Sequence, residues 1–163
     1  MESESYTGVA MGSGGRVGGS SLPFDFRINY YSTDEDVQRL ATLLKEKGQD
    51  DLRRALEKLD AGRINPVGSV GNTIAIARKR QQGKETIITI VTARYMSFGE
   101  LTRSSRSIDY PFGFLRVTLN EKGEGTGKII GAAKLRFDKK KGHYEIESYG
   151  NQYVRATNVR PNR

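Results

Sequence analysis

Apolar and polar residues alternate along many short stretches of this chain, a pattern typical of half-buried β-strands. The clearest stretch is residues 24–30, where Phe24, Phe26, Ile28 and Tyr30 share one face. From residue 64 onward, turns that contain glycine separate such stretches. The pattern predicts strands over Tyr6–Ala10, Phe24–Tyr30, Thr73–Lys79, Thr86–Ala93, Leu115–Leu119, Gly127–Phe137, Tyr144–Ser148 and Tyr153–Val159.

One part of the chain has a helical pattern instead. Apolar residues recur at helical spacing over Val37–Leu44, after polar and acidic residues suited to a helix start and before Gly48. These features predict a helix over Asp34–Lys47. The same spacing over Leu52–Leu59 predicts a second helix. We expect a helical hairpin at about 34–60 that lies against the sheet as a lid or plug.

The predicted fold is mainly β, a single domain over residues 1–163 with a flexible Gly-rich loop at 12–21. Roughly 7–9 sequential strands favour an antiparallel up-and-down barrel, and a two-sheet sandwich is the alternative. Glycines and alanines on one face of Gly127–Phe137 either relieve crowding in a curved barrel or leave space for a ligand.

Composition removes several kinds of chemistry. The chain has no cysteine, which excludes disulfides, thiol nucleophiles and thiolate metal sites. His143 is the only histidine, so metal sites built from several histidines are excluded too. No apolar run is long enough to span a bilayer, and we expect a soluble protein without a cofactor or metal.

The formal net charge of +8 is concentrated in residues 115–163, which hold 11 Lys or Arg against 5 Asp or Glu. A basic face attracts anionic partners, but it also serves solubility alone. Because Lys139, Lys140 and Lys141 fall in a tight turn, we expect a solubility face that binds no specific nucleic acid.

The candidate site is the long connection between the strands that end at Ala93 and begin near Gly113. Long connections of this kind often bind something, and this one combines arginines, tyrosines and carboxylates. The alternative is structural, with an ion pair between Arg106 and Asp109 that orders the loop. The candidate ligand-binding residues are Arg94, Tyr95, Arg103, Arg106, Asp109 and Tyr110.

Over residues 6–160 the chain resembles a group of bacterial, β-rich single-domain proteins of unknown function that are usually met with an export signal. The motifs that carry the resemblance are Ser21–Phe24, Ser32–Glu35, Lys45–Gly48, Ser107–Phe112, Gly123–Thr126 and Asn158–Arg160. The resemblance implies a bacterial, exported protein and identifies no site residues. Residues 1–5 lack the features of a secretory signal, so we expect any export signal to be absent from this sequence.

Three functions remain open. The leading hypothesis is a non-enzymatic barrel protein that binds a small amphipathic or apolar ligand in the barrel mouth. The second is a metal-independent enzyme of the barrel cavity, an isomerase or hydrolase that uses Arg106, Asp109 and Tyr110. The third is a nucleic-acid or polyanion binder that uses the basic C-terminal strands.

Overall fold

The structure is a computed structural model that describes residues 2–12, 20–96, 110–148 and 154–162. Within these ranges the chain forms nine strands and two helices. The elements are β1 (Glu4–Gly12), β2 (Ser21–Ile28), α1 (Asp34–Lys47), α2 (Gln49–Leu56), β3 (Gly62–Pro66), β4 (Asn72–Gln82), β5 (Glu85–Thr92), β6 (Phe112–Leu119), β7 (Gly125–Asp138), β8 (His143–Ser148) and β9 (Val154–Pro161).

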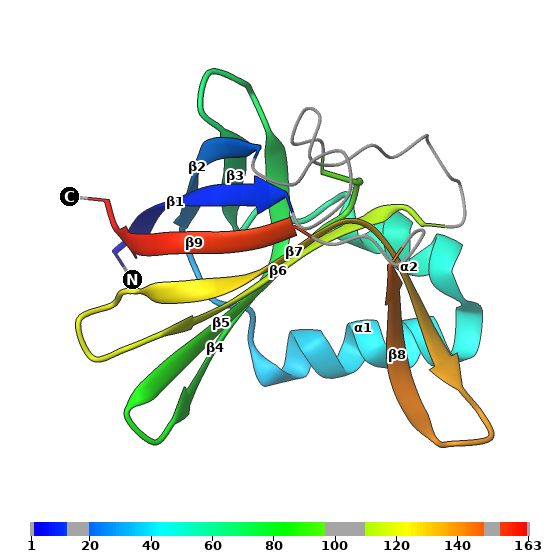
Figure 1. The fold of residues 1–163 in the computed structure, drawn as a ribbon. Helices are drawn as coiled ribbons and strands as arrows, with labels where there is room; N and C mark the ends of the chain where they lie inside the picture. The colour runs from blue at the N-terminus through cyan, green and yellow to red at the C-terminus, as the bar shows by residue number, and fades with distance from the viewer. Residues whose placement is uncertain (1, 13–19, 97–109, 149–153, 163) are drawn as a thin grey trace.

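Eight of these strands close into an antiparallel barrel. Consecutive strands from β1 to β7 are neighbours, and β9 returns to pair with both β1 and β7. The ninth strand, β8, pairs only with the far half of β7, and this hairpin extends away from the barrel (Figure 1). The predicted antiparallel barrel with an inserted helical hairpin is therefore confirmed, and the structure is not a sandwich.

Apolar side chains fill the barrel interior among the described residues. The alternation predicted for β2 holds there, because Phe24, Phe26 and Ile28 are buried, whereas Tyr30 lies beyond the strand and is 39% exposed. The Tyr6 ring stacks on Phe26 with 5.0 Å between ring centroids. The larger residues of this interior cluster also include Ile64, Ile74, Ile88, Ile90, Met96, Leu115, Val117, Leu119, Ile129, Val154 and Val159.

The small residues of β7 have a structural explanation where β7 meets β6. A Cβ atom added to Gly127 would lie 2.1 Å from the carbonyl oxygen of Arg116, so only glycine permits this approach of the two strands. At this position, the prediction that small residues relieve crowding is the one that the structure supports.

The helical hairpin covers part of the outer wall of the barrel. Thr33 caps α1 by accepting a hydrogen bond from the Asp36 N–H at 3.1 Å, and Gly48 ends the helix with a positive φ of 99°. Leucines of both helices pack against outward side chains of β4 to β7 such as Phe112 and Ile130. The hairpin thus lies against the sheet as expected, but on its outer face rather than as a plug (Figure 1). Neither helix in the described ranges is long and apolar enough to cross a membrane.

A bulge in β7 separates its barrel half from its hairpin half. Phe114 pairs with Ile130 and Phe112 pairs with Ala133, so β7 carries one extra residue over this step. Ile129 therefore belongs to the barrel interior, whereas Ala133 and Leu135 face the helices. Strict alternation along Gly127–Phe137 predicts that these three residues share one face, and this prediction is wrong because the extra residue reverses the alternation.

Candidate functional site

The six residues predicted to bind a ligand are only partly described. Arg103, Arg106 and Asp109 lie outside the described residues, so the loop site and its ion pair stay predictions. Arg94 is exposed, and its carbonyl oxygen accepts a hydrogen bond from the Thr92 hydroxyl at 2.6 Å.

The two described tyrosines of that loop have different surroundings. The Tyr95 carbonyl oxygen accepts a hydrogen bond from the Asn72 side chain at 3.1 Å, which ties it to the start of β4. The half-buried Tyr110 ring lies 6.0 Å from the Lys134 ammonium on β7. These contacts anchor the two ends of the loop to separate strands, and they do not by themselves form a binding site.

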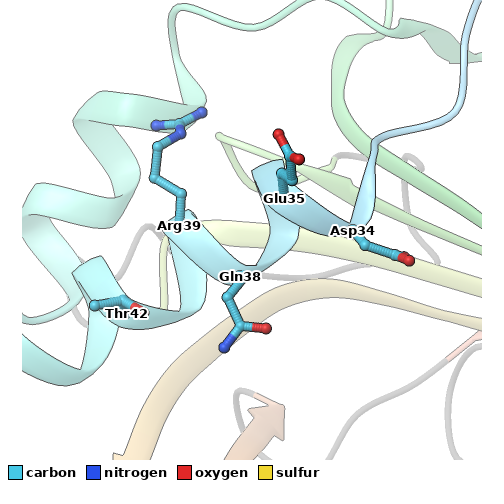
Figure 2. A pocket seen from close by; sticks show the side chains of 5 residues that line it. All are labelled: Asp34, Glu35, Gln38, Arg39 and Thr42. Atoms are coloured by element: carbon cyan, nitrogen blue, oxygen red, sulfur yellow. The ribbon is translucent and has the colours of Figure 1, made fainter.

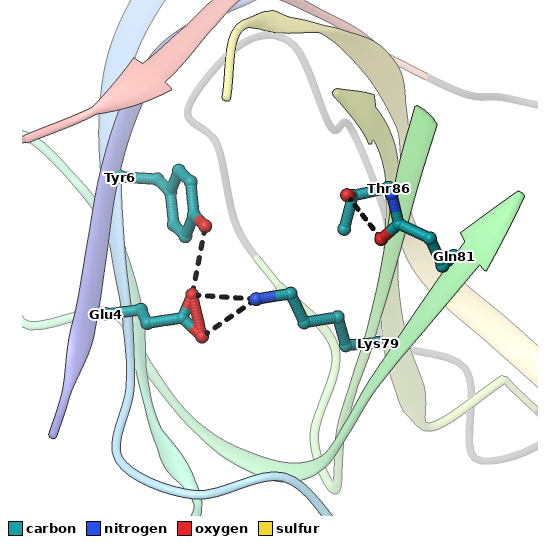
Figure 3. Close-up of polar contacts among 5 residues, drawn as sticks. All are labelled: Glu4, Tyr6, Lys79, Gln81 and Thr86. Carbon is teal, nitrogen blue, oxygen red and sulfur yellow. Dashed lines mark hydrogen bonds and ion pairs between the residues drawn. The ribbon is translucent and has the colours of Figure 1, made fainter. Parts of the chain in front are cut away.

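A polar cluster closes one end of the barrel (Figure 3). The Glu4 carboxylate accepts a hydrogen bond from the Tyr6 hydroxyl at 3.2 Å and forms an ion pair with Lys79 at 3.3 Å. Burial first, and then the negative charge of Glu4, raise the pKa of Tyr6 to about 12. The same two causes raise the pKa of Tyr31, whose hydroxyl is buried without a hydrogen-bond partner in the described structure.

This cluster fits a structural role better than a catalytic one. The Glu4 carboxylate and the Lys79 ammonium neutralise each other, and the Tyr6 phenol, whose pKa is raised to about 12, is protonated at neutral pH. A general base needs a pKa near the working pH, and the raised pKa of Tyr6 moves that group away from it.

The exposed surface of α1 offers a shallow hollow of about 540 Å³, lined by Asp34, Glu35, Gln38, Arg39 and Thr42 (Figure 2). All five side chains come from one helix, and the three charged ones include both signs. No described residue of another element forms an opposite wall, so this surface lacks the enclosed shape of a small-molecule site.

The outer wall of the barrel carries a more distinctive arrangement on β6 and β7. Three cross-strand pairs follow one another along the two strands: Phe114 faces Ile130, Arg116 faces Lys128, and Thr118 faces Thr126. Residues directly opposite in an antiparallel pair point to the same face of the sheet. From Phe114 to Thr118 of β6, the outward side chains of the wall therefore change from apolar to cationic to hydroxyl-bearing.

These three pairs line a hollow of about 410 Å³, which we call the outer hollow. Ile146 of β8 adds an apolar side chain that is 44% exposed, because the β7–β8 hairpin bends away from the barrel and forms a wall beside it. Gly127 completes the described lining, which contains no aspartate, glutamate or histidine.

The cations of the outer hollow belong to a longer row across the sheet. Arg78 of β4 faces Thr89 of β5, which faces Arg116, and Lys128 faces Arg155 of β9. Arg116 donates to the Thr89 hydroxyl at 3.3 Å and lies 5.5 Å from the Phe114 ring. Neither Arg116 nor Arg155 has an ion pair with another described residue. The centre of the row is thus strongly positive.

This arrangement can hold a negatively charged group without chemical reaction. Guanidinium and ammonium groups donate charge-assisted hydrogen bonds to carboxylates and phosphates, and two threonine hydroxyls can add neutral ones. Ile146 and the small exposed parts of Phe114 and Ile130, which are each 8% exposed, can contact a hydrocarbon or ring attached to that group. Within the described ranges, no cluster of three His, Asp or Glu side chains could hold a metal ion.

Comparison with known proteins adds no relative, because no protein-family model, curated protein or solved structure matches the chain. The bacterial group that the chain resembles stays an expectation. What the chain binds must therefore be argued from its own residues.

Sequence reasoning recognised the outward residues of β6 and β7 but not their combination. Alternation over Leu115–Leu119 and Gly127–Phe137 puts Arg116, Thr118 and Lys128 on the polar sides of two strands, which by itself indicates only a solvated face. A signal was available: a hairpin turn centred on Lys122 places residues 114, 116 and 118 opposite 130, 128 and 126. The contribution of Ile146 had no such signal, because it depends on the bend of β7.

Proposed function

We propose that this protein is a non-enzymatic binding protein whose ligand is a small anionic amphiphile held in the outer hollow. One observation carries the proposal: apolar, cationic and hydroxyl pairs succeed one another on β6 and β7 inside a single hollow. The negatively charged head group would lie between Arg116 and Lys128, and its apolar part against Phe114, Ile130 and Ile146.

The energetics of the sheet support a binding role for the cations. Like charges directly opposite each other on adjacent strands destabilise a sheet by a few tenths of a kcal/mol to about 1 kcal/mol. Arg116, Lys128 and Arg155 occupy such facing positions on three adjacent strands. An anion between Arg116 and Lys128 would be attracted by both cations.

The described lining of the hollow contains no carboxylate and no imidazole. Imidazole and carboxylate groups are the commonest acid–base groups of enzymes, so the lining favours binding over acid–base catalysis. The described barrel interior is occupied by its own apolar side chains, which favours the outer wall over the barrel as the binding place.

The test uses decyl phosphate below its critical micelle concentration, with decyl maltoside as the neutral amphiphile of equal chain length. We expect decyl phosphate to bind to the wild type and to shift amide resonances of β6 and β7 in NMR spectra. Arg116→Gln and Lys128→Gln should each weaken binding about tenfold, since a hydrogen bond to a charged group contributes about 1.5–3 kcal/mol.

Lys122→Gln is the matched control, because Lys122 is exposed in the turn between the same two strands but does not line the hollow. It should leave the affinity unchanged. Equal affinities of the wild type, Arg116→Gln and Lys128→Gln for decyl phosphate would refute the proposal. Resonance shifts confined to residues of the interior cluster would instead favour a ligand inside the barrel.

A second candidate function is the binding of an extended polyanion across the strands, which the facing positions of Arg116, Lys128 and Arg155 on three neighbouring strands favour. Binding of this kind weakens steeply with salt through counterion release. Our prediction is that single-stranded and duplex oligonucleotides do not bind with submicromolar affinity at physiological salt. Submicromolar binding that is lost in Arg116→Gln and Arg155→Gln would favour the polyanion instead.

A further inference from the structure

A second hollow adjoins the outer hollow on the same wall of the barrel. It has a volume of about 430 Å³ and is lined by Arg78, Lys79, Arg80, Ile87, Thr89 and Arg116, and we call it the basic hollow. Arg116 lines both hollows, which makes them neighbours along the cationic row. The described lining of the basic hollow contains no carboxylate.

Two cations of the basic hollow already have acidic partners. The Arg78 guanidinium donates to the Ser32 carbonyl oxygen and forms an ion pair with Asp34 at the start of α1. The Lys79 ammonium is paired with Glu4 in the cluster at the barrel end. These two contacts hold structural elements together and leave little positive charge available from either side chain.

Arg80 and Arg116 differ from them. The Arg80 guanidinium donates to the Gln82 side chain at 3.3 Å, and Arg116 donates to the Thr89 hydroxyl, so each contacts only a neutral acceptor among the described residues. In the described structure neither arginine belongs to an ion pair. The basic hollow therefore presents two uncompensated guanidinium groups.

The register gives the spacing of these two groups. Arg80 faces Ile87 on β5, and Arg116 faces Thr89 on the other side of the same strand. Their Cα atoms are thus two strand spacings apart across the sheet and two residues apart along the strand, a separation of about 12 Å in a regular sheet. At that separation, two long side chains contact two neighbouring anionic groups of one ligand more readily than they meet at a single oxygen. The Thr89 hydroxyl, which lies between them, retains a proton to donate.

We infer that the basic hollow is a second anion subsite, and that the ligand of the outer hollow is an amphiphile whose polar end carries two linked anionic groups, such as a diphosphate. This inference rests on the proposed function. The first anionic group lies between Arg116 and Lys128, and the second lies toward Arg80 and Thr89. The apolar part extends in the opposite direction, toward Ile146.

The test compares decyl phosphate with decyl diphosphate, which have the same alkyl chain and differ by one phosphate. The wild type should bind the diphosphate about tenfold more tightly than the monophosphate, the gain that one further charge-assisted contact provides. Arg80→Gln should remove this preference while it leaves the affinity for the monophosphate unchanged. Inorganic diphosphate should bind far more weakly than decyl diphosphate, which separates the amphiphile from a free phosphate source.

The matched control is Lys84→Gln, because Lys84 is exposed in the β4–β5 turn, carries the same charge as Arg80 and does not line the basic hollow. It should keep the diphosphate preference. Loss of the preference in Lys84→Gln as well would show that only the net charge matters, and would overturn the subsite. Equal affinity of the wild type for the two phosphates, both weakened by Arg116→Gln, would overturn this inference but leave the proposed function standing. No effect of Arg116→Gln on either phosphate would refute the proposed function itself.

Discussion

Alkaline pH should destabilise this protein through Tyr6, and the structure gives the size of the effect. Tyr6 is 8% exposed, and its hydroxyl donates to Glu4. Burial and the Glu4 charge raise its pKa from 10.0 to about 12. In the unfolded chain the phenol loses its proton near pH 10, whereas in the folded barrel it keeps the proton. The unfolded state then binds fewer protons, so the free energy of unfolding falls as pH rises above 10.

The contribution of Tyr6 is fully present below pH 10 and is lost progressively up to the folded pKa of about 12. Each pKa unit corresponds to about 1.4 kcal/mol, so the total is on the order of 3 kcal/mol and about half of it is lost by pH 11. Other effects of alkaline pH are common to the wild type and to a Tyr6→Phe variant, so the difference between the two isolates the Tyr6 phenol.

The assay is urea unfolding at pH 8 to 11 for the wild type, Tyr6→Phe and Tyr30→Phe. Tyr30 is 39% exposed, so Tyr30→Phe is the matched control. Between pH 9 and 11 the wild type and Tyr30→Phe should lose roughly 1–2 kcal/mol more stability than Tyr6→Phe does. Parallel pH profiles of the wild type and Tyr6→Phe would refute the reasoning, because they would mean that the Tyr6 pKa is the same in the folded and unfolded chains.

Two further predictions concern packing. Gly125→Ala should lower the thermal midpoint by several degrees, because the new Cβ would lie 1.9 Å from the Thr118 carbonyl oxygen. Thr126→Ala on the outer face is the control and should have little effect. An unchanged midpoint for Gly125→Ala would contradict the close approach of the two strands. Gln49→Ala should destabilise the protein by about 1–2 kcal/mol, because the Gln49 side chain accepts a hydrogen bond from the Leu135 N–H at 2.8 Å. Hydrogen exchange of the Leu135 amide should also become faster in this variant. Unchanged exchange would show that the hydrogen bond is not maintained in solution.

The local elements of this protein could be predicted from the sequence because local interactions determine them. The helix over Asp34–Lys47 was predicted with its observed bounds, since a capping threonine begins it and Gly48 ends it within the same short stretch. The alternation of β2 predicted which of its side chains are buried, because successive strand residues point to opposite faces. Sequential antiparallel strands with short turns also predicted the barrel.

The candidate site was decided by tertiary structure. A hairpin turn alone would bring Arg116 opposite Lys128, but Arg155 and Arg78 join the row only because β9 returns beside β7 and β5 separates β4 from β6. The extra residue at the β7 bulge turns the β7–β8 hairpin away from the barrel, and this places Ile146 beside the outer hollow. Local propensity carries no information on such pairings between distant segments. The sequence by itself therefore determined the elements and the barrel class, and the closure of the sheet determined which of its charges meet.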